Sequence, residues 1–153
     1  SNCTLILGDN FFYGHKLSDK IKIKTLDGAK IFLHPVKNPN NYGVPKIENN
    51  KIKKIYEKPK KFISNYAVTG LYQYDKNVAK YVKTLKKSKR GEYEITDLNN
   101  IYLKKGKLKY EILGKGYTWL DAGTFDDLLD ASLYVRTIQQ RQGILIGNIN
   151  KNT

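Results

Sequence analysis

Two aspartates stand where short apolar runs end, and they are the first residues that could do chemistry. Asp9 follows the run "CTLIL" with one residue, Gly8, between them, and Asp121 closes the run "YTWLD". In α/β proteins, ligands bind outside the carboxyl ends of strands. Mg²⁺ prefers hard oxygen ligands, often one or two carboxylates together with phosphate oxygens. If Asp9 and Asp121 meet, they could share one Mg²⁺; from their spacing alone, ordinary capping of turns and helices is the better interpretation.

Three further segments carry groups suited to a phosphorylated sugar. "EKP" places Glu57 beside Lys58. A carboxylate can accept hydrogen bonds from adjacent sugar hydroxyls, and a lysine supplies a point charge for phosphate. Gly43 of "NYGV" and Val68 of "SNYAVTGLY" lie in segments where glycine leaves the backbone bare for close approach of a sugar ring. Taken singly, "EKP" is more typical of a surface turn than of a sugar-phosphate site.

The elements that must position these residues indicate an α/β domain. Strands are predicted at 3–7, 29–36, 66–75, 107–114 and 117–121, with a hairpin over 43–59 that turns at "ENN". Helical spacing predicts helices near 17–24, 76–85, 95–104 and 125–142. Residues 8–15 are predicted to form a loop. Because strands and helices alternate loosely, we expect a mainly parallel or mixed sheet flanked by helices.

The boundaries of the last helix are marked by its own residues. Thr124 can cap its start, with Asp127 in the capping-box position, and Gly143 can end it. We assign residues 1–143 to one domain that carries the sugar-phosphate and metal sites, and residues 144–153 to a C-terminal tail.

Composition narrows the class of protein. Hydrophobic residues make up 40% of the 153 residues, which is enough for a packed core. We find no apolar run long enough to cross a membrane and no signal-peptide pattern. The single cysteine, Cys3, lies in an apolar run, so we expect it in the core of a protein from a reducing compartment, the cytoplasm.

The charge of the chain is strongly positive. Its net value of +14 attracts anions, but the lysines are scattered rather than gathered into one arm. They accompany no zinc-finger spacing, helix-turn-helix signal or RNP-type motif. A solvated lysine-rich surface accounts for them, and we expect no nucleic-acid partner.

Seven motifs follow one another along the chain: "LGDNFFYGH", "NYGV", "EKP", "SNYAVTGLY", "GEYEITDLN", "WLDAGT" and "RQG". In this order they resemble the bacterial sugar-nucleotide pyrophosphorylases, and among these the thymidylyltransferases that act on glucose 1-phosphate. The resemblance spans nearly the whole chain. It implies part of the Rossmann-like nucleotidyltransferase fold.

The resemblance also implies a role for each matching residue. Asp9, Lys58 and Asp121 would be catalytic, with Mg²⁺ as the cofactor held by the two aspartates. The sugar-phosphate pocket would be formed by Gly43, Glu57, Lys58 and Val68. Four more residues would lie near it: Tyr72, Glu92, Thr96 and Trp119. "FYGH" and "RQG" resemble parts of a regulatory nucleotide site, and such proteins are usually homotetramers.

The implied reaction joins dTTP and glucose 1-phosphate into dTDP-glucose and pyrophosphate, a supply step for dTDP-rhamnose and cell-surface polysaccharide. Nothing in the sequence matches the loop G-x-G-T-R-L-x-P-x-T that cradles the triphosphate in similar proteins, and the sequence contains no methionine. We therefore expect a fragment that is inactive alone. A UTP- or CTP-using enzyme and a non-catalytic sugar-nucleotide-binding or regulatory domain are the alternatives.

Overall fold

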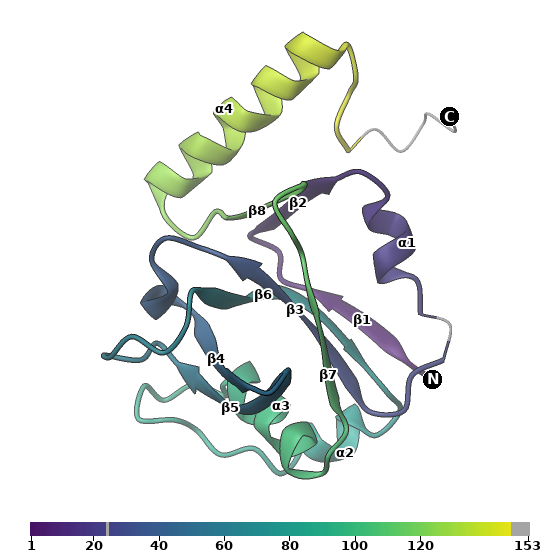
Figure 1. The fold of residues 1–153 in the computed structure, drawn as a ribbon, viewed down its shortest axis with the longest axis vertical. Coiled ribbons are helices and arrows are strands. Elements are labelled where there is room, and N and C mark those ends of the chain that lie inside the picture. The colour runs from purple at the N-terminus through teal and green to yellow at the C-terminus, as the bar shows by residue number, and fades with distance from the viewer. Residues whose placement is uncertain (24, 148–153) are drawn as a thin grey trace.

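The computed structural model describes residues 1–23 and 25–147. Its centre is a four-stranded sheet in the order β1–β6–β3–β7, formed by β1 (Cys3–Ile6), β6 (Tyr66–Tyr74), β3 (Ala29–Pro35) and β7 (Leu108–Ile112) (Figure 1). β6 runs antiparallel to both β1 and β3, whereas β3 and β7 are parallel. The expectation of a mixed sheet is confirmed, and that of a mainly parallel sheet is wrong. The chain returns from β3 to β6 through the β4–β5 hairpin, and the segment from β6 to β7 contains two helices.

Two smaller ribbons flank this sheet. β4 (Gly43–Glu48) and β5 (Lys51–Glu57) form the expected hairpin, in which Asn49 and Asn50 have φ angles of 49° and 57°. Two successive positive φ angles are typical of the type I′ turn that joins tight hairpins.

The second ribbon pairs β2 (Asn10–Gly14) antiparallel with β8 (Tyr117–Asp121). The prediction of a loop over residues 8–15 is therefore wrong for most of that segment. Its aromatic residues are strand formers, and they find partners in a strand more than a hundred positions away, which local pattern does not reveal.

The main core lies between the sheet, the hairpin and α3 (Ile95–Lys104). It is formed by side chains that are buried almost completely, among them Ile31, Leu33, Ile55, Tyr74 and Tyr102. The helix α3 has the predicted bounds. The helices α1 (Leu17–Ile21) and α2 (Val78–Val82) are shorter than predicted, and residue 24 of the first prediction lies outside the described residues. A short 3-10 helix, η1 (Pro39–Asn41), precedes the hairpin.

The long helix α4 (Phe125–Gln142) extends away from the sheet and lies over the β2–β8 ribbon (Figure 1). Its start is capped as predicted, because the Thr124 hydroxyl oxygen accepts a hydrogen bond from the Asp127 backbone N–H at 3.1 Å. Gly143 ends it with a φ of 65°. Tyr134 anchors it to the ribbon through a 2.8 Å hydrogen bond with Thr118. Of the expected tail, residues 148–153 lie outside the described part.

Cys3 is exposed, so the prediction that it is a core residue is wrong. Every residue of β1 is exposed, because in the described structure this strand is the edge of the sheet and pairs only with β6. Among the described residues, no helix is long and apolar enough to cross a membrane.

Candidate active site

A cavity of about 180 Å³ opens where the β4–β5 hairpin, the β2–β8 ribbon and the start of α3 meet β6. Its lining includes all six residues predicted to form the site: Asp9, Gly43, Glu57, Lys58, Val68 and Asp121. The structure thus brings together residues that are spread over more than a hundred positions of sequence. We call the part formed by Asp9 and Asp121 the carboxylate side, and the part formed by Gly43, Glu57 and Lys58 the hairpin side.

The carboxylate side depends on the pairing of β2 with β8. Asp9 lies in the turn between β1 and β2, and Asp121 is the last residue of β8. The Ala122 backbone N–H donates to the Asp9 carbonyl at 2.8 Å, which ties the two segments together. Both carboxylates lie within hydrogen-bond distance of one nitrogen, Nδ2 of Asn10, at 2.8 Å for Asp9 and 3.3 Å for Asp121. The aspartates therefore do meet, through an antiparallel ribbon rather than at the ends of parallel strands.

The electrostatics of this pair favour a cation. Burial raises the pKa of the Asp121 carboxyl above its usual range, and the negative charges of Asp9 and Asp127 raise it further. The positive charge of Lys58 acts in the opposite direction. Two carboxylates whose proximity disfavours ionisation form a donor set that fits a hard divalent cation.

The protein supplies few side chains that could bind a metal ion beside Asp9 and Asp121. Over residues 1–23 and 25–147, the structure contains no group of three or more His, Cys, Asp or Glu residues that could hold a metal ion. A cation on Asp9 and Asp121 would therefore need oxygen ligands from water or from a bound phosphate. That ligand set is typical of Mg²⁺ in phosphate chemistry.

On the hairpin side, Gly43 and Glu57 face each other across the β4–β5 ladder. The Thr96 hydroxyl donates to Oε2 of Glu57 at 2.5 Å, which fixes one carboxylate oxygen and leaves the other available to a ligand. A Cβ atom at Gly43 would lie 3.1 Å from the Thr96 hydroxyl oxygen, tighter than nearly all ordinary contacts. The absence of a side chain at Gly43 thus keeps this part of the cavity open.

Lys58 has an unusual backbone. Its φ angle is 40°, in the left-handed region that non-glycine residues rarely adopt, and its N–H donates to the Tyr42 carbonyl at 3.0 Å. This conformation follows directly on the end of β5 and leaves Lys58 in the lining of the same cavity as the two aspartates. Rare backbone conformations of this kind often occur at functional sites.

The floor of the cavity comes from β6. Val68, Gly70 and Tyr72 all line it, as expected for alternate residues of one strand. Burial raises the pKa of the Tyr72 hydroxyl, and the charges of Glu57 and the two aspartates add to the effect, so Tyr72 is a neutral hydrogen-bonding group. Trp119 forms a wall and packs against Tyr42 with ring centroids 5.0 Å apart.

Of the four residues expected near the pocket, Tyr72, Thr96 and Trp119 line it, and Glu92 does not. Glu92 is exposed and accepts a 2.7 Å hydrogen bond from Arg90. Sequence reasoning missed Arg90, whose guanidinium also lies 3.9 Å from both Glu57 and Glu94. The one feature of the sequence that points to Arg90 is its position directly before the "GEYEITDLN" motif.

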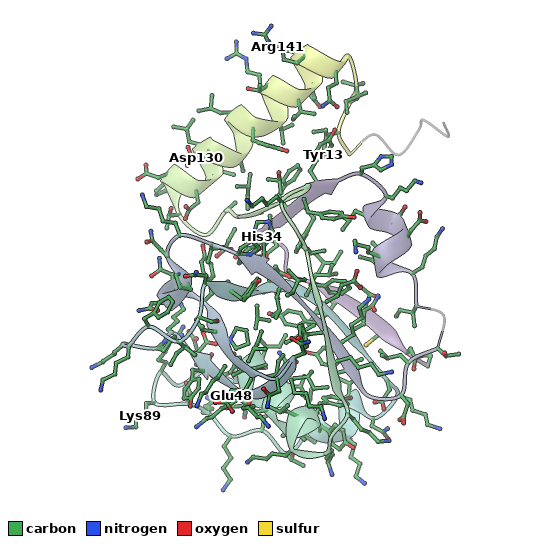
Figure 2. All side chains as sticks on the ribbon, in the orientation of Figure 1. Tyr13, His34, Glu48, Lys89, Asp130 and Arg141 are labelled. Atoms are coloured by element: carbon green, nitrogen blue, oxygen red, sulfur yellow. The ribbon has the colours of Figure 1, made fainter. Side chains whose placement is uncertain are left out.

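The two segments expected to form a regulatory site also lie together. The Tyr13 hydroxyl of "FYGH" donates to Oε1 of Gln142 in "RQG" at 2.8 Å. Figure 2 shows Tyr13 on β2 below the end of α4 that carries Arg141.

Residues 1–138 match the family model described as nucleotidyl transferase. The chain belongs to this family. Its sequence is 50% identical over 145 residues to glucose-1-phosphate thymidylyltransferase of Mycolicibacterium smegmatis, covering 94% of this chain and 50% of that protein. It is 48% identical over 144 residues to the Mycobacterium tuberculosis protein of the same name, covering 93% and 50%. The chain thus spans about half the length of these curated relatives.

Solved structures agree with this assignment. A putative glucose-1-phosphate thymidylyltransferase from Bacillus anthracis, crystallised with sucrose, superposes with a TM-score of 0.75 at 45% identity, covering 88% of this chain and 55% of that one. A UDP-glucose pyrophosphorylase complexed with UDP-glucose superposes with a TM-score of 0.72 at 21% identity, covering 89% and 56%. The second likeness shows the fold alone. The predicted nucleotidyltransferase fold is therefore confirmed.

Proposed function

We propose that the protein containing this chain is a glucose-1-phosphate thymidylyltransferase, which forms dTDP-glucose and pyrophosphate from dTTP and glucose 1-phosphate. The observation that carries the proposal is that Asp9, Asp121, Glu57 and Lys58 all line one cavity. The names of the relatives that are 45–50% identical to this chain favour dTTP as the nucleotide. UTP or CTP remains the alternative that the assay below separates.

The reaction requires positioning and charge neutralisation rather than a nucleophilic side chain. A phosphate oxygen of glucose 1-phosphate forms a bond to the α-phosphorus of dTTP, and the bond from that phosphorus to the β-phosphate oxygen breaks. Pyrophosphate leaves with the electron pair. The attacking phosphate is already ionised, so no general base is needed. Catalysis then depends on aligning two mutually repelling anions.

The residues of the cavity divide this work. Lys58 would hold the phosphate of the sugar and offset its repulsion from the triphosphate. Glu57 would accept hydrogen bonds from sugar hydroxyls, and Gly43 and Val68 would let the ring lie against the backbone. Asp9 and Asp121 would hold Mg²⁺, which supplies charge neutralisation of phosphate oxygens when bound.

The test is an assay of the full-length protein with glucose 1-phosphate, Mg²⁺ and each of dTTP, UTP and CTP, with release of pyrophosphate as the readout. The proposal expects the highest kcat/KM with dTTP. Tight binding of dTDP-glucose without turnover would instead establish a non-catalytic sugar-nucleotide-binding protein. The 153-residue chain assayed in parallel is predicted to show negligible turnover.

We also propose that the full-length protein is a cytoplasmic homo-oligomer, as its resemblance to tetrameric pyrophosphorylases implies. Light scattering coupled to size-exclusion chromatography measures the assembly directly. A monomer at micromolar concentration would contradict this part of the proposal.

A further inference from the structure

The side chain of Asn10 makes contacts that the proposed binding of substrates and metal does not by itself require. It is the first residue of β2 and lies directly opposite Asp121 in the β2–β8 ladder. Its side chain has four polar neighbours, two on each end of the amide. This arrangement is unusual for a half-exposed residue at the start of a strand, where water could satisfy the same groups.

The orientation of the Asn10 amide is fixed by two donors. Its Oδ1 accepts hydrogen bonds from the Gly70 backbone N–H at 2.9 Å and from the Trp119 indole N–H at 2.6 Å. Both partners can only donate, so the oxygen must face them. The amide nitrogen is therefore held toward the opposite side, where Asp9 and Asp121 lie.

The nitrogen end then contacts both carboxylates. Its two hydrogens match the two acceptors, Oδ1 of Asp9 at 2.8 Å and Oδ1 of Asp121 at 3.3 Å. A donor shared between two anions reduces their repulsion and fixes the spacing of their oxygens. Carboxylates that bind metals are commonly held by hydrogen bonds of this kind, and loss of such partners weakens metal binding.

The lack of a side chain at Gly70 independently supports the observed orientation of the Asn10 amide. A Cβ atom at that position would lie 2.3 Å from Oδ1 and 2.4 Å from Cγ of Asn10. Any side chain at residue 70 would therefore push the Asn10 amide away from the aspartates. The strand β6 leaves this space free for Asn10.

We propose that Asn10 is a positioning residue that sets the spacing of Asp9 and Asp121 for a divalent cation and couples this pair to Trp119 in the wall of the cavity. The inference rests on the proposed function, because it assumes that the two aspartates bind the cation. Asn10 also lines the cavity, but the proposed role requires no contact between its side chain and the substrate. Its effect passes through the two carboxylates.

The experiment measures Mn²⁺ binding to the full-length protein by electron paramagnetic resonance, without nucleotide. Asn10→Ala is expected to raise the Kd for Mn²⁺ about 10- to 100-fold. Asn10→Asp keeps an oxygen for the two donors but turns the nitrogen into a third carboxylate oxygen beside Asp9 and Asp121. It is expected to bind Mn²⁺ more tightly than the wild type, at least about tenfold, since carboxylates are preferred ligands.

Asn41→Asp is the matched control. Asn41 lines the same cavity, and among the described hydrogen bonds its side chain makes none to Asp9 or Asp121. The same change of charge there should alter the Mn²⁺ affinity much less than Asn10→Asp. Equal effects of the two substitutions would show a general charge effect and overturn the role of Asn10.

The coupling to Trp119 has its own readout. Trp119 is the only tryptophan of this sequence, and its indole N–H resonance in a nitrogen–proton correlation spectrum can be assigned with Trp119→Phe. Mg²⁺ is expected to shift this resonance in the wild type and to leave it unshifted in Asn10→Ala. A purely structural Asn10 would change thermal stability without removing the Mg²⁺-dependent shift.

Asp9→Asn distinguishes a failure of the proposed metal site from a failure of the proposed role of Asn10. If it leaves Mn²⁺ binding unchanged, the metal site of the proposed function is wrong, and the role of Asn10 fails with it. If Asp9→Asn abolishes Mn²⁺ binding while both Asn10 variants bind like the wild type, only the role of Asn10 is wrong.

Discussion

The hairpin side of the cavity is built from neighbouring segments, whereas its carboxylate side, Asp9 and Asp121, joins distant ones. Asn10, next to Asp9, contacts Asp121 across 111 positions of sequence. Gly43 and Glu57 meet because a tight turn folds one hairpin on itself, and α3 packs on that hairpin over a buried core. Asp9 and Asp121 meet only because β2 and β8 pair. The hairpin side should therefore tolerate changes elsewhere in the chain, and the carboxylate side should depend on long-range pairing.

The two sides should also fail in different ways when they are changed. Asp121→Asn is expected to have the largest effect, a loss of at least about 100-fold in kcat, because preorganised charge stabilisation at phosphate is lost. The measurement is steady-state kinetics of the full-length protein at saturating dTTP and glucose 1-phosphate.

The same variant should be more stable without metal. Because the folded-state pKa of Asp121 is raised, its contribution to stability is present at low pH and is lost as pH rises through that pKa. At neutral pH the ionised carboxyl therefore costs stability, and Asn removes this cost. A lower Tm for metal-free Asp121→Asn than for the wild type would contradict the charge environment described for this side.

Changes on the hairpin side should act on substrate binding. Glu57→Gln and Lys58→Met are each expected to raise the KM for glucose 1-phosphate about 10- to 100-fold, because a hydrogen bond to a charged group is lost. The KM for dTTP should change much less. Equal increases in both KM values would show that Glu57 and Lys58 do not act specifically on glucose 1-phosphate.

The pH dependence of metal binding sharpens the comparison further. A carboxyl must lose its proton to bind a metal ion. Burial and neighbouring charges raise the pKa of Asp121. Mn²⁺ affinity should therefore fall as the pH is lowered, and this fall should begin at a higher pH than it would for an ordinary aspartate. Asp127→Asn removes one of the charges that raise this pKa, so its midpoint should move to lower pH. An unchanged or higher midpoint in Asp127→Asn would contradict this explanation.

The smallest effect is expected at the hairpin turn. Asn50 has a φ of 57°, which alanine adopts at a cost of about 1–2 kcal/mol, so Asn50→Ala should lower the free energy of unfolding by about that amount. Asn50→Gly, which accepts positive φ, is the control and should not show this loss. Denaturant unfolding measures both. Loss of Mn²⁺ binding in folded Asn50→Ala would contradict the independence of the two sides.

The difference between short-range and long-range contacts also explains which parts of the fold could be predicted from the sequence. The hairpin, α3 and the capped start of α4 follow from short-range signals such as "ENN", helical spacing and the Thr124–Asp127 pair. The strand β2 could not be predicted, because its pairing partner is distant and its own residues lie between turn formers. Cys3 was misassigned for a similar reason, since local apolar pattern does not tell an edge strand from a central one.

The site residues were found by type, spacing and resemblance, but the groups that hold them were not. Asn10 contacts Asp121 across 111 positions of sequence, and Arg90 lies 3.9 Å from Glu57. Periodicity carries no information about such contacts. Only the folded chain shows that Asn10 has a fixed orientation and that Arg90 lies beside Glu57.

The most direct test of the account is a crystal structure of the full-length protein with Mn²⁺ and dTDP-glucose, with the metal located by its anomalous scattering. The account predicts one peak about 2.0–2.3 Å from carboxylate oxygens of both Asp9 and Asp121, with a phosphate of the ligand on the metal and Lys58 beside it. A peak elsewhere, with both aspartates free of metal, would contradict it.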